Sequence, residues 1–326
     1  FMSDTPPVAA FTPDTSSPVA GSDAGSLGTP TLVDLNGDGD LDLVVGSNDG
    51  TLGYFENTGT ATAPVYVERT VAANPFNGID VGDWSAPTFT DLNGDGDLDL
   101  VVGAYDGTLR YFVNTGSTAV PAFNPVATPG PLDGIDVGYA STPVFGDLDN
   151  DGDADLLVGA NDGTLRYFEN TGTTAAPVYV ERTDTANPFD AIDAGYASTP
   201  TFVDLNGDGD LDLLVGAVDG GITYFENTGT TAAPAYVERT GAANPFSTLD
   251  VGTHSAPSFG DLDGDGDLDV LVGANDGTLH YFAGIPPGTG GNDVVYVGDG
   301  DNVVVGGYGD DTIVAGTGAD VILGDN

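Results

Sequence analysis

The chain has 326 residues, of which 51 are acidic and only 5 are basic, so its formal charge at pH 7 is −46. This charge excludes nucleic acid and anionic membrane surfaces as partners, because both are negative and would be repelled. Intrinsic disorder does not fit either, since 40% of the residues are hydrophobic. No segment approaches the length of a transmembrane helix, so we expect no membrane insertion.

An acidic segment recurs along the chain at a nearly constant spacing. The segment "DLNGDGDLDL" occupies residues 34–43, 91–100 and 204–213, with near-copies at 147–156 and 261–270. Successive copies begin 56 or 57 residues apart. A fixed period of this length indicates a repeat architecture, in which each unit is one supersecondary structure.

Each unit predicts a series of short strands. In residues 200–240 these are "PTFVDL", "LDLLVGAVDG" after the acidic loop, "GITYFENTG" and "APAYVERT". All are rich in β-branched and aromatic residues and are bounded by Gly, Asn, Asp or Pro, which is typical of strands. Four strands per unit with a period above 50 favour a propeller blade over a solenoid coil. Five independent modules are disfavoured, because single blades cannot bury their faces alone.

The two ends of this region predict how the ring closes. The fifth unit has three strands and then departs into "AGIPPGTGG", so it lacks its fourth strand. In other units, the segment of the fourth strand stands at a fixed interval before the start of the next blade. The N-terminal segment "PPVAAFT" at 6–12 stands at the same interval before Pro30, where the first blade starts. We therefore predict an all-β, five-bladed β-propeller over residues 1–285, closed by the N-terminal strand.

The spacing within the acidic loop indicates a cation site. Oxygen-bearing side chains occupy alternate positions, from one to nine, beginning with Asp34, Asn36 and Asp38. Calcium prefers six to eight oxygen ligands in a flexible arrangement, whereas magnesium needs a stricter octahedron and is the weaker candidate. Gly39 permits a sharp bend, but Val45 stands where an EF-hand has glutamate. A solvated acidic turn without metal is the alternative.

Residues 145–162 ("FGDLDNDGDADLLVGAND") and 259–276 ("FGDLDGDGDLDVLVGAND") resemble the FG-GAP/VCBS repeats of integrin α-subunit-type propellers. The resemblance implies one calcium ion on the loop that joins the first two strands of each blade. We expect side-chain ligands at positions one, three, five and nine, and a backbone carbonyl ligand at position seven. The predicted metal-binding residues are Asp34, Asn36, Asp38, Asp40 and Asp42; Asp91, Asn93, Asp95, Asp97 and Asp99; Asp147, Asp149, Asp151, Asp153 and Asp155; Asp204, Asn206, Asp208, Asp210 and Asp212; and Asp261, Asp263, Asp265, Asp267 and Asp269.

After Pro287 the period changes to nine residues. "GDGDNVVVG" (298–306), "GYGDDTIVA" (307–315) and "GTGADVILG" (316–324) resemble RTX nonapeptide repeats. The resemblance implies a short parallel β-roll over residues 286–326 that binds further calcium, with Asp293, Asp311 and Asp320 as ligands. It also implies a secreted bacterial protein, hence an extracellular or cell-surface location. A flexible glycine-rich linker is the alternative, but linkers lack such a valine and isoleucine column.

The sequence favours a binding or structural role over catalysis. The clustered carboxylates are committed to the repeated loops, and no nucleophile or carboxylate pair stands out, so we predict that the chain is not an enzyme. A glycosidase-type propeller is the least favoured alternative. The resemblance to FG-GAP propellers implies that the face opposite the loops is the one where the repeats differ. Aromatic residues there are candidates for stacking on a sugar or anchoring a protein, or they simply cover neighbouring loops. These residues are Trp84, Tyr105, Tyr139, Tyr196 and His254.

The prediction is thus a calcium-binding, non-catalytic structural or adhesion protein of a bacterial surface or matrix. Its partners would be calcium and either further copies of itself, forming a filament or layer, or a surface glycan or protein. A lectin-like, calcium-stabilised glycan-binding module is the main alternative.

Overall fold

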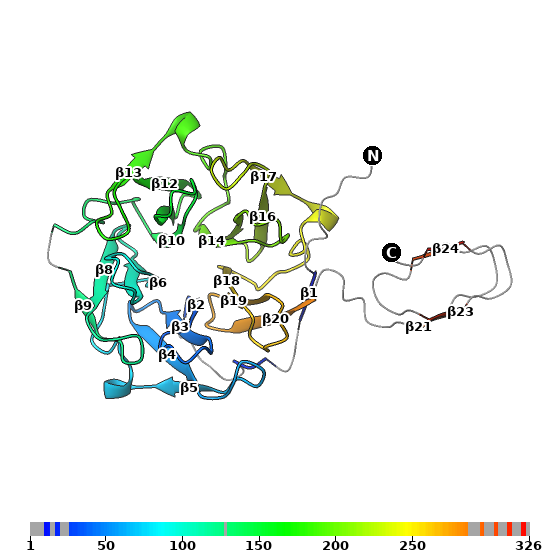
Figure 1. The fold of residues 1–326 in the computed structure, drawn as a ribbon, viewed down its shortest axis with the longest axis horizontal. Helices are drawn as coiled ribbons and strands as arrows, with labels where there is room; N and C mark the ends of the chain where they lie inside the picture. The colour runs from blue at the N-terminus through cyan, green and yellow to red at the C-terminus, as the bar shows by residue number, and fades with distance from the viewer. Residues whose placement is uncertain are drawn as a thin grey trace.

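The computed structural model describes residues 10–13, 17–19, 26–126 and 129–285, together with four short strands near the C-terminal end. Residues 10–285 form a ring of five four-stranded antiparallel sheets (Figure 1). The predicted all-β, five-bladed propeller is therefore confirmed. The first strand of each blade lies nearest the ring axis and the fourth lies at the rim.

The strands follow the predicted order within each repeat. Their bounds are β2 (Thr29–Val33), β3 (Asp42–Gly46), β4 (Leu52–Asn57) and β5 (Tyr66–Arg69) in blade 1; β6 (Ala86–Thr90), β7 (Asp99–Gly103), β8 (Leu109–Asn114) and β9 (Phe123–Pro125) in blade 2; β10 (Thr142–Gly146), β11 (Asp155–Gly159), β12 (Leu165–Asn170) and β13 (Tyr179–Arg182) in blade 3; β14 (Thr199–Val203), β15 (Asp212–Gly216), β16 (Ile222–Asn227) and β17 (Tyr236–Arg239) in blade 4; and β18 (Ala256–Gly260), β19 (Asp269–Gly273) and β20 (Leu279–Ile285) in blade 5.

Blade 5 is completed by the N-terminal strand, as predicted. Strand β1 (Ala10–Pro13) pairs antiparallel with β20, with Phe11 opposite Gly284. The Phe11 ring stacks on Phe246 at 4.8 Å between centroids and meets Phe259 edge-on at 6.2 Å. The closing strand is thus held by both backbone pairing and an aromatic anchor.

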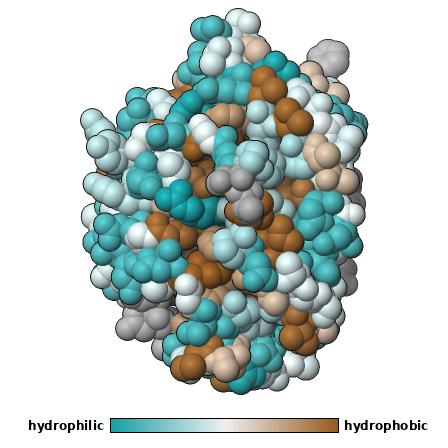
Figure 2. Space-filling view, turned by 90° about the vertical axis from the view of Figure 1, so that its left-hand side faces the viewer, coloured by the Kyte–Doolittle hydropathy of each residue, from teal (hydrophilic) through white to brown (hydrophobic). Residues whose placement is uncertain are grey.

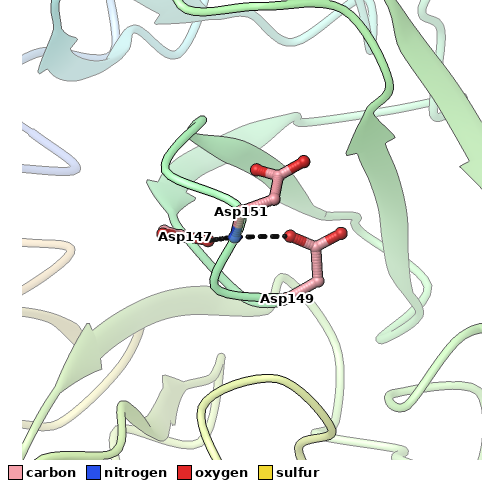
Figure 3. A group of neighbouring side chains, drawn as sticks. All are labelled: Asp147, Asp149 and Asp151. Carbon is pink, nitrogen blue, oxygen red and sulfur yellow. Dashed lines mark hydrogen bonds between the residues drawn. The ribbon is translucent and has the colours of Figure 1, made fainter.

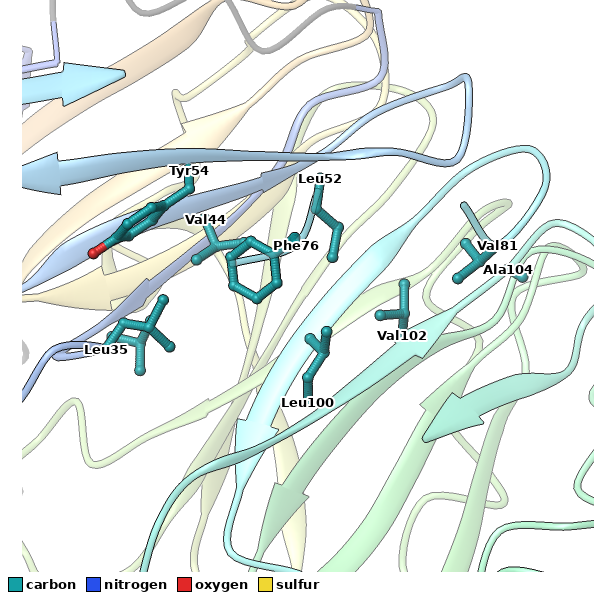
Figure 4. Packing of buried hydrophobic residues seen from close by; sticks show 10 residues of the cluster. Leu35, Val44, Leu52, Tyr54, Phe76, Val81, Leu100, Val102 and Ala104 are labelled. Atoms are coloured by element: carbon teal, nitrogen blue, oxygen red, sulfur yellow. The ribbon is translucent and has the colours of Figure 1, made fainter. Parts of the chain in front are cut away.

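The hydrophobic core lies between neighbouring blades. Every residue of the second strand of each blade is buried, because its alternate side chains point into the two flanking blades. In one cluster, Val44 of blade 1 packs with Leu100 and Val102 of blade 2, and Phe76 of the connection fills the space between them (Figure 4). The blades share their cores, which explains why they form a ring rather than separate modules.

A repeated backbone contact joins the blades around the axis. The N–H of the residue two positions before each first strand donates to a carbonyl in the hairpin of the preceding blade. Leu27 closes the ring by donating to Asn275 at 3.0 Å. These donors all have positive φ, between 50° and 59°, although none is glycine. They are Leu27, Trp84, Ala140, Ala197 and His254.

A buried serine strengthens four of these junctions. In blade 3, the Ser141 hydroxyl accepts the N–H of Ala104 at 2.9 Å and donates to the Thr108 carbonyl at 2.8 Å. Ser85, Ser198 and Ser255 make the equivalent contacts. Blade 1 has Gly28 at this position. The junction between blades 5 and 1 therefore lacks these serine hydrogen bonds.

Blade 2 departs from the others at its rim. Blades 1, 3 and 4 carry an ion pair between their third and fourth strands, such as Arg69 with Glu56 at 2.7 Å. In blade 2, Val113 and Val126 occupy the equivalent positions. Figure 2 shows the side of the ring on which β8 and β9 lie, where apolar residues gather near the middle of a mostly hydrophilic surface.

The remaining elements are short. Three 3-10 helices connect blades at their rims, η1 (Val71–Ala73), η2 (Asp184–Ala186) and η3 (Gly241–Ala243). No helix among the described residues is long and apolar enough to cross a membrane. Near the C-terminal end, β21 (Val294–Tyr296) pairs in parallel with β23 (Thr312–Val314), and β22 (Val303–Val305) with β24 (Val321–Leu323). Asp293, Asp311 and Asp320 lie outside the described residues, so the β-roll and its calcium sites stay predictions.

Candidate functional site

The acidic loops coil so that alternate side chains turn back over the chain. In the first loop, Asp34 accepts the N–H groups of Gly37 at 2.8 Å and Gly39 at 3.0 Å. Asn36 accepts the N–H of Asp38 at 2.9 Å. The other four loops repeat most of these bonds. Each loop is therefore one continuous segment whose geometry depends on few distant contacts.

Positions one, three and five converge in the two loops where all three residues are aspartate. One carboxylate oxygen from each of Asp147, Asp149 and Asp151 lies within 4.8 Å of the others (Figure 3). Asp261, Asp263 and Asp265 converge in the same way. Three like charges so close repel one another unless a cation lies between them. The oxygen donors and their flexible loop suit a hard divalent cation such as calcium.

Position nine lies beneath the loop and is buried. The Asp42 carboxylate accepts the Tyr54 hydroxyl at 2.8 Å and the N–H of Asn57 at 2.8 Å. Burial nevertheless raises the pKa of Asp42 to about 6, because removal from water disfavours the charged carboxylate. Asp155 and Asp212 have the same contacts and the same raised pKa. A cation in the loop would compensate this buried charge.

In two blades the aspartate at position seven of the loop accepts a hydrogen bond from a residue outside the loop. The Thr118 hydroxyl donates to Asp97 at 2.6 Å, and the Thr174 hydroxyl donates to Asp153 at 2.6 Å. Both threonines lie in the turn between the third and fourth strands of the same blade. These side chains are thereby engaged away from the neighbouring carboxylates, which supports a backbone rather than a side-chain ligand at this position.

The loops also pack against the next blade. A Cβ atom added at Gly37 would lie 2.8 Å from a methyl group of Thr118, and one at Gly94 would lie 2.9 Å from Ala175. Gly264 of blade 5 approaches Thr62 of blade 1 equally closely. Blade 3 has Asn150 here, at φ 61°. The conformation of such a loop therefore affects how the next blade packs against it. The sequence did not predict this role of the loops.

Sequence reasoning also missed the residues that hold position nine. The tyrosine and asparagine of the third strand, Tyr54 and Asn57 in blade 1, were treated only as strand residues. The repeated "YFEN" of three of the blades was the available signal. An asparagine at the end of a strand in every copy but the fifth is otherwise unexpected, because asparagine is depleted in strands.

We expect Asp147→Asn to weaken the calcium site of blade 3 specifically. Asparagine keeps one acceptor oxygen for the loop N–H groups but removes the charge that attracts the ion. Isothermal titration should show one bound calcium fewer per chain than in the unmodified protein. Asp190→Asn, an exposed aspartate outside the loops, is the matched control. An unchanged stoichiometry would show that Asp147 is not a ligand.

The opposite end of the ring axis brings four of the five predicted partner residues together. The ring of Trp84 lies 5.3 Å from Tyr105 and 5.6 Å from His254, and Tyr105 lies 5.7 Å from Tyr139. Tyr196 is exposed on the next blade and makes no ring contact with the other four. We call Trp84, Tyr105, Tyr139 and His254 the axial aromatic cluster.

A small apolar pocket lies at the base of this cluster. It is lined by one positive-φ residue from each blade, and the five differ in size although their positions are equivalent. Trp84 of blade 2 and His254 of blade 5 supply the two large side chains, while Ala140 and Ala197 leave space. The symmetric backbone therefore presents an asymmetric surface at the axis, the property that a specific binding site needs.

Comparison with known protein families identifies both repeat types. The model of the FG-GAP-like repeat matches residues 34–102, 91–158, 147–215 and 204–272. The model of the RTX calcium-binding nonapeptide repeat matches residues 287–322. No curated protein matches the chain. The RTX match supports calcium binding, and such repeats are typical of secreted bacterial proteins.

Solved structures share the fold at low sequence identity. The α-L-arabinofuranosidase PaAbf62A from Podospora anserina, solved with cellotriose, is 16% identical with a TM-score of 0.51, covering 87% of this chain and 99% of that one. A thermostable family-43 glycoside hydrolase is 12% identical with a TM-score of 0.49, covering 79% and 88%. An Agrocybe aegerita lectin that recognises terminal N-acetylglucosamine is 19% identical with a TM-score of 0.39, covering 80% and 66%.

One prediction must be corrected. We expected that the chain is not an enzyme, because no catalytic constellation stood out among repeated loops. The similarity to PaAbf62A contradicts this, since propeller enzymes share the fold. The physical reason is that a ring of repeats brings single side chains from several blades together at its axis, where sequence alone cannot show which of them meet.

The family assignment rests on the repeats themselves. The matched FG-GAP-like repeats overlap in a continuous run from residue 34 to residue 272, which is most of the chain. They include all five acidic loops and reach the second strand of the fifth blade. The chain therefore belongs to the family of FG-GAP-like repeat proteins.

Proposed function

We propose that this protein is a calcium-stabilised structural or adhesion propeller of a bacterial surface or matrix. The observations that carry the proposal are the convergence of loop carboxylates in blades 3 and 5 and the close packing of the loops of blades 1, 2 and 5 on their neighbours. In this arrangement calcium both neutralises the loop and fixes the angle between blades. The residue at position nine, buried without a cationic partner, fits the same role.

The proposed ligands in each loop are the side chains at positions one, three, five and nine and the backbone carbonyl of position seven. One ion per loop gives five propeller sites, with further sites in the C-terminal repeats at 287–322. Exposed calcium sites of this kind have Kd values on the order of 10⁻⁴–10⁻³ M, which suits extracellular calcium concentrations. This agrees with a location outside the cell.

The proposed partner surface is the axial aromatic cluster together with Tyr196. At this end of the ring axis the blades differ in their side chains, so they offer a distinctive surface. Exposed Tyr105, Tyr139 and Tyr196 supply rigid contact area, which is typical of residues that dominate binding energy. A surface glycan or a surface protein is the proposed partner.

Binding of the purified chain to bacterial surface fractions, matrix fractions and a glycan array tests this proposal. We expect binding that needs calcium and is lost in a Trp84→Ala, Tyr139→Ala double variant, since both side chains belong to the cluster. Glu238→Gln, on the rim strand β17, is the control for a change elsewhere on the surface. Hits confined to the array would favour the lectin-like alternative. Equal binding by all three proteins would overturn the proposed surface.

Self-assembly is the second part of the proposal. The valine and isoleucine column of the C-terminal repeats needs a cover, and we propose that a second copy of the chain supplies it. Two strongly acidic chains repel one another unless calcium screens or bridges them. Light scattering across a calcium titration should show association of the full chain that disappears when residues 286–326 are deleted. A monomeric mass for both proteins at every calcium concentration would exclude assembly through this region.

A further inference from the structure

Exposed aspartates from every blade surround the axial aromatic cluster. One set comes from the hairpin between the second and third strands, and a second set comes from the turn that leads into the next blade. Backbone hydrogen bonds hold the two sets side by side, as from Val81 to Gly50 at 3.1 Å and from Val137 to Gly107 at 2.9 Å. The aspartates are Asp49, Asp80, Asp83, Asp106, Asp136, Asp162, Asp193, Asp219, Asp250 and Asp276.

Little positive charge offsets this ring of carboxylates. All five arginines already pair with a carboxylate, and only Arg110 pairs with an aspartate of the ring, Asp106, at 2.9 Å. Burial lowers the pKa of the His254 imidazole, which favours its uncharged form. Asp83, next to Trp84 in the chain, has no ion-pair partner among the described residues. The face therefore attracts cations and repels anions.

The cluster at the centre of this ring has the chemistry of a cation site. The Tyr105 and His254 rings stand at 71° and 82° to the indole of Trp84, in edge contacts rather than stacks. Nδ1 of His254 is buried without a hydrogen-bond partner. The faces of Trp and Tyr rings attract organic cations, and the pocket walls beneath are apolar.

We propose that the axial aromatic cluster binds a quaternary ammonium group. The apolar pocket accommodates the methyl groups, the aromatic faces attract the charge, and the surrounding aspartates supply the long-range field. A neutral sugar gains nothing from this field, and a phosphate or carboxylate is repelled by it. The inference rests on the proposed function, because it names the ligand chemistry of the same surface.

The single tryptophan of the chain provides a direct test, since the fluorescence of Trp84 reports only on this cluster. Choline is titrated at saturating calcium and fixed ionic strength, beside 3,3-dimethylbutan-1-ol, which has the same shape without the charge. We expect a saturable change with choline and at least tenfold weaker binding of the neutral isostere. Equal affinity for the two probes, or no saturable response to choline, overturns the inference.

Variants and a third probe sharpen the result. Tyr105→Ala and Asp83→Asn should each weaken choline binding by threefold or more, while Glu238→Gln on the rim should leave it unchanged. Melting temperatures equal to that of the unmodified protein show that the variants are folded. Phosphocholine should bind more weakly than choline, because the aspartate ring repels its phosphate; tighter binding of phosphocholine contradicts the charge argument.

Failure of this inference is distinguishable from failure of the proposed function. Suppose choline does not bind but the surface and matrix fractions still bind in a way that requires Trp84. The axial aromatic cluster then binds a partner that carries no quaternary ammonium group, and only the proposed ligand chemistry is wrong. Choline binding with no binding to any surface fraction or glycan would support the ligand chemistry and count against the surface or matrix role.

Discussion

Removal of calcium with a chelator should lower the melting temperature of the protein by roughly 15 °C or more. A ligand that binds only the folded state stabilises it by about 1.4 kcal/mol per site at ten times its Kd, so five loops together contribute on the order of 7 kcal/mol. Chelation also leaves the converging carboxylates, such as Asp147, Asp149 and Asp151, without a counter-ion. Thermal unfolding followed by circular dichroism, with and without chelator, measures the shift.

Re-addition of metal provides the control for this experiment. Calcium should restore the original melting temperature, whereas an equal concentration of magnesium should restore little of it, because magnesium requires a small and regular octahedron. A simple salt at the same ionic strength separates screening of the overall charge from binding at the loops. A melting curve that does not respond to the chelator would contradict the role of calcium in the fold.

Deletion of residues 1–13 should destabilise the propeller far beyond the size of the segment removed. The deletion exposes the edge of β20 and leaves blade 5 with three strands. It also removes Phe11 from its stack on Phe246. Denaturant unfolding of the truncated and complete chains measures the loss.

A single substitution tests the same closure without changing the chain length. Phe11→Ala should cost about 3–5 kcal/mol, the usual effect of removing a packed phenylalanine, with partial exposure placing it toward the lower end. Val120→Ala is the control for a large-to-small change at the surface, because Val120 is 71% exposed. If Phe11→Ala and Val120→Ala unfold at the same denaturant concentration, the N-terminal strand does not hold the ring closed.

Much of the fold was predictable because its determinants are local. The alternating apolar residues of the strands and the period of the acidic loops act within a few residues, so each blade could be outlined from its own segment. The closing strand could be predicted because its interval before Pro30 repeats that of the other fourth strands. The loop itself is one continuous segment, which is why its coiling could be expected from the spacing of Asp34, Asn36 and Asp38.

The contacts that hold the acidic loops in place could not be predicted from the sequence. Asp42 could be marked by its spacing, but its burial beside Tyr54 and Asn57 results from the pairing of β3 with β4. Likewise, the close approach of Gly37 to Thr118 crosses from one blade to the next. Such contacts depend on the angle between neighbouring sheets, which packing of the shared core determines.

The sequence by itself determined the all-β repeat architecture, the number of blades, the strand that closes the ring and the alternating oxygen donors of the loops. Only the tertiary structure decided which side chains meet at the axis. Trp84 of blade 2 and His254 of blade 5 are far apart in the chain, and their rings come within 5.6 Å because the ring closes. The physical reason is that strand pattern and loop spacing are local properties, whereas the axial surface exists only when all five blades are packed together.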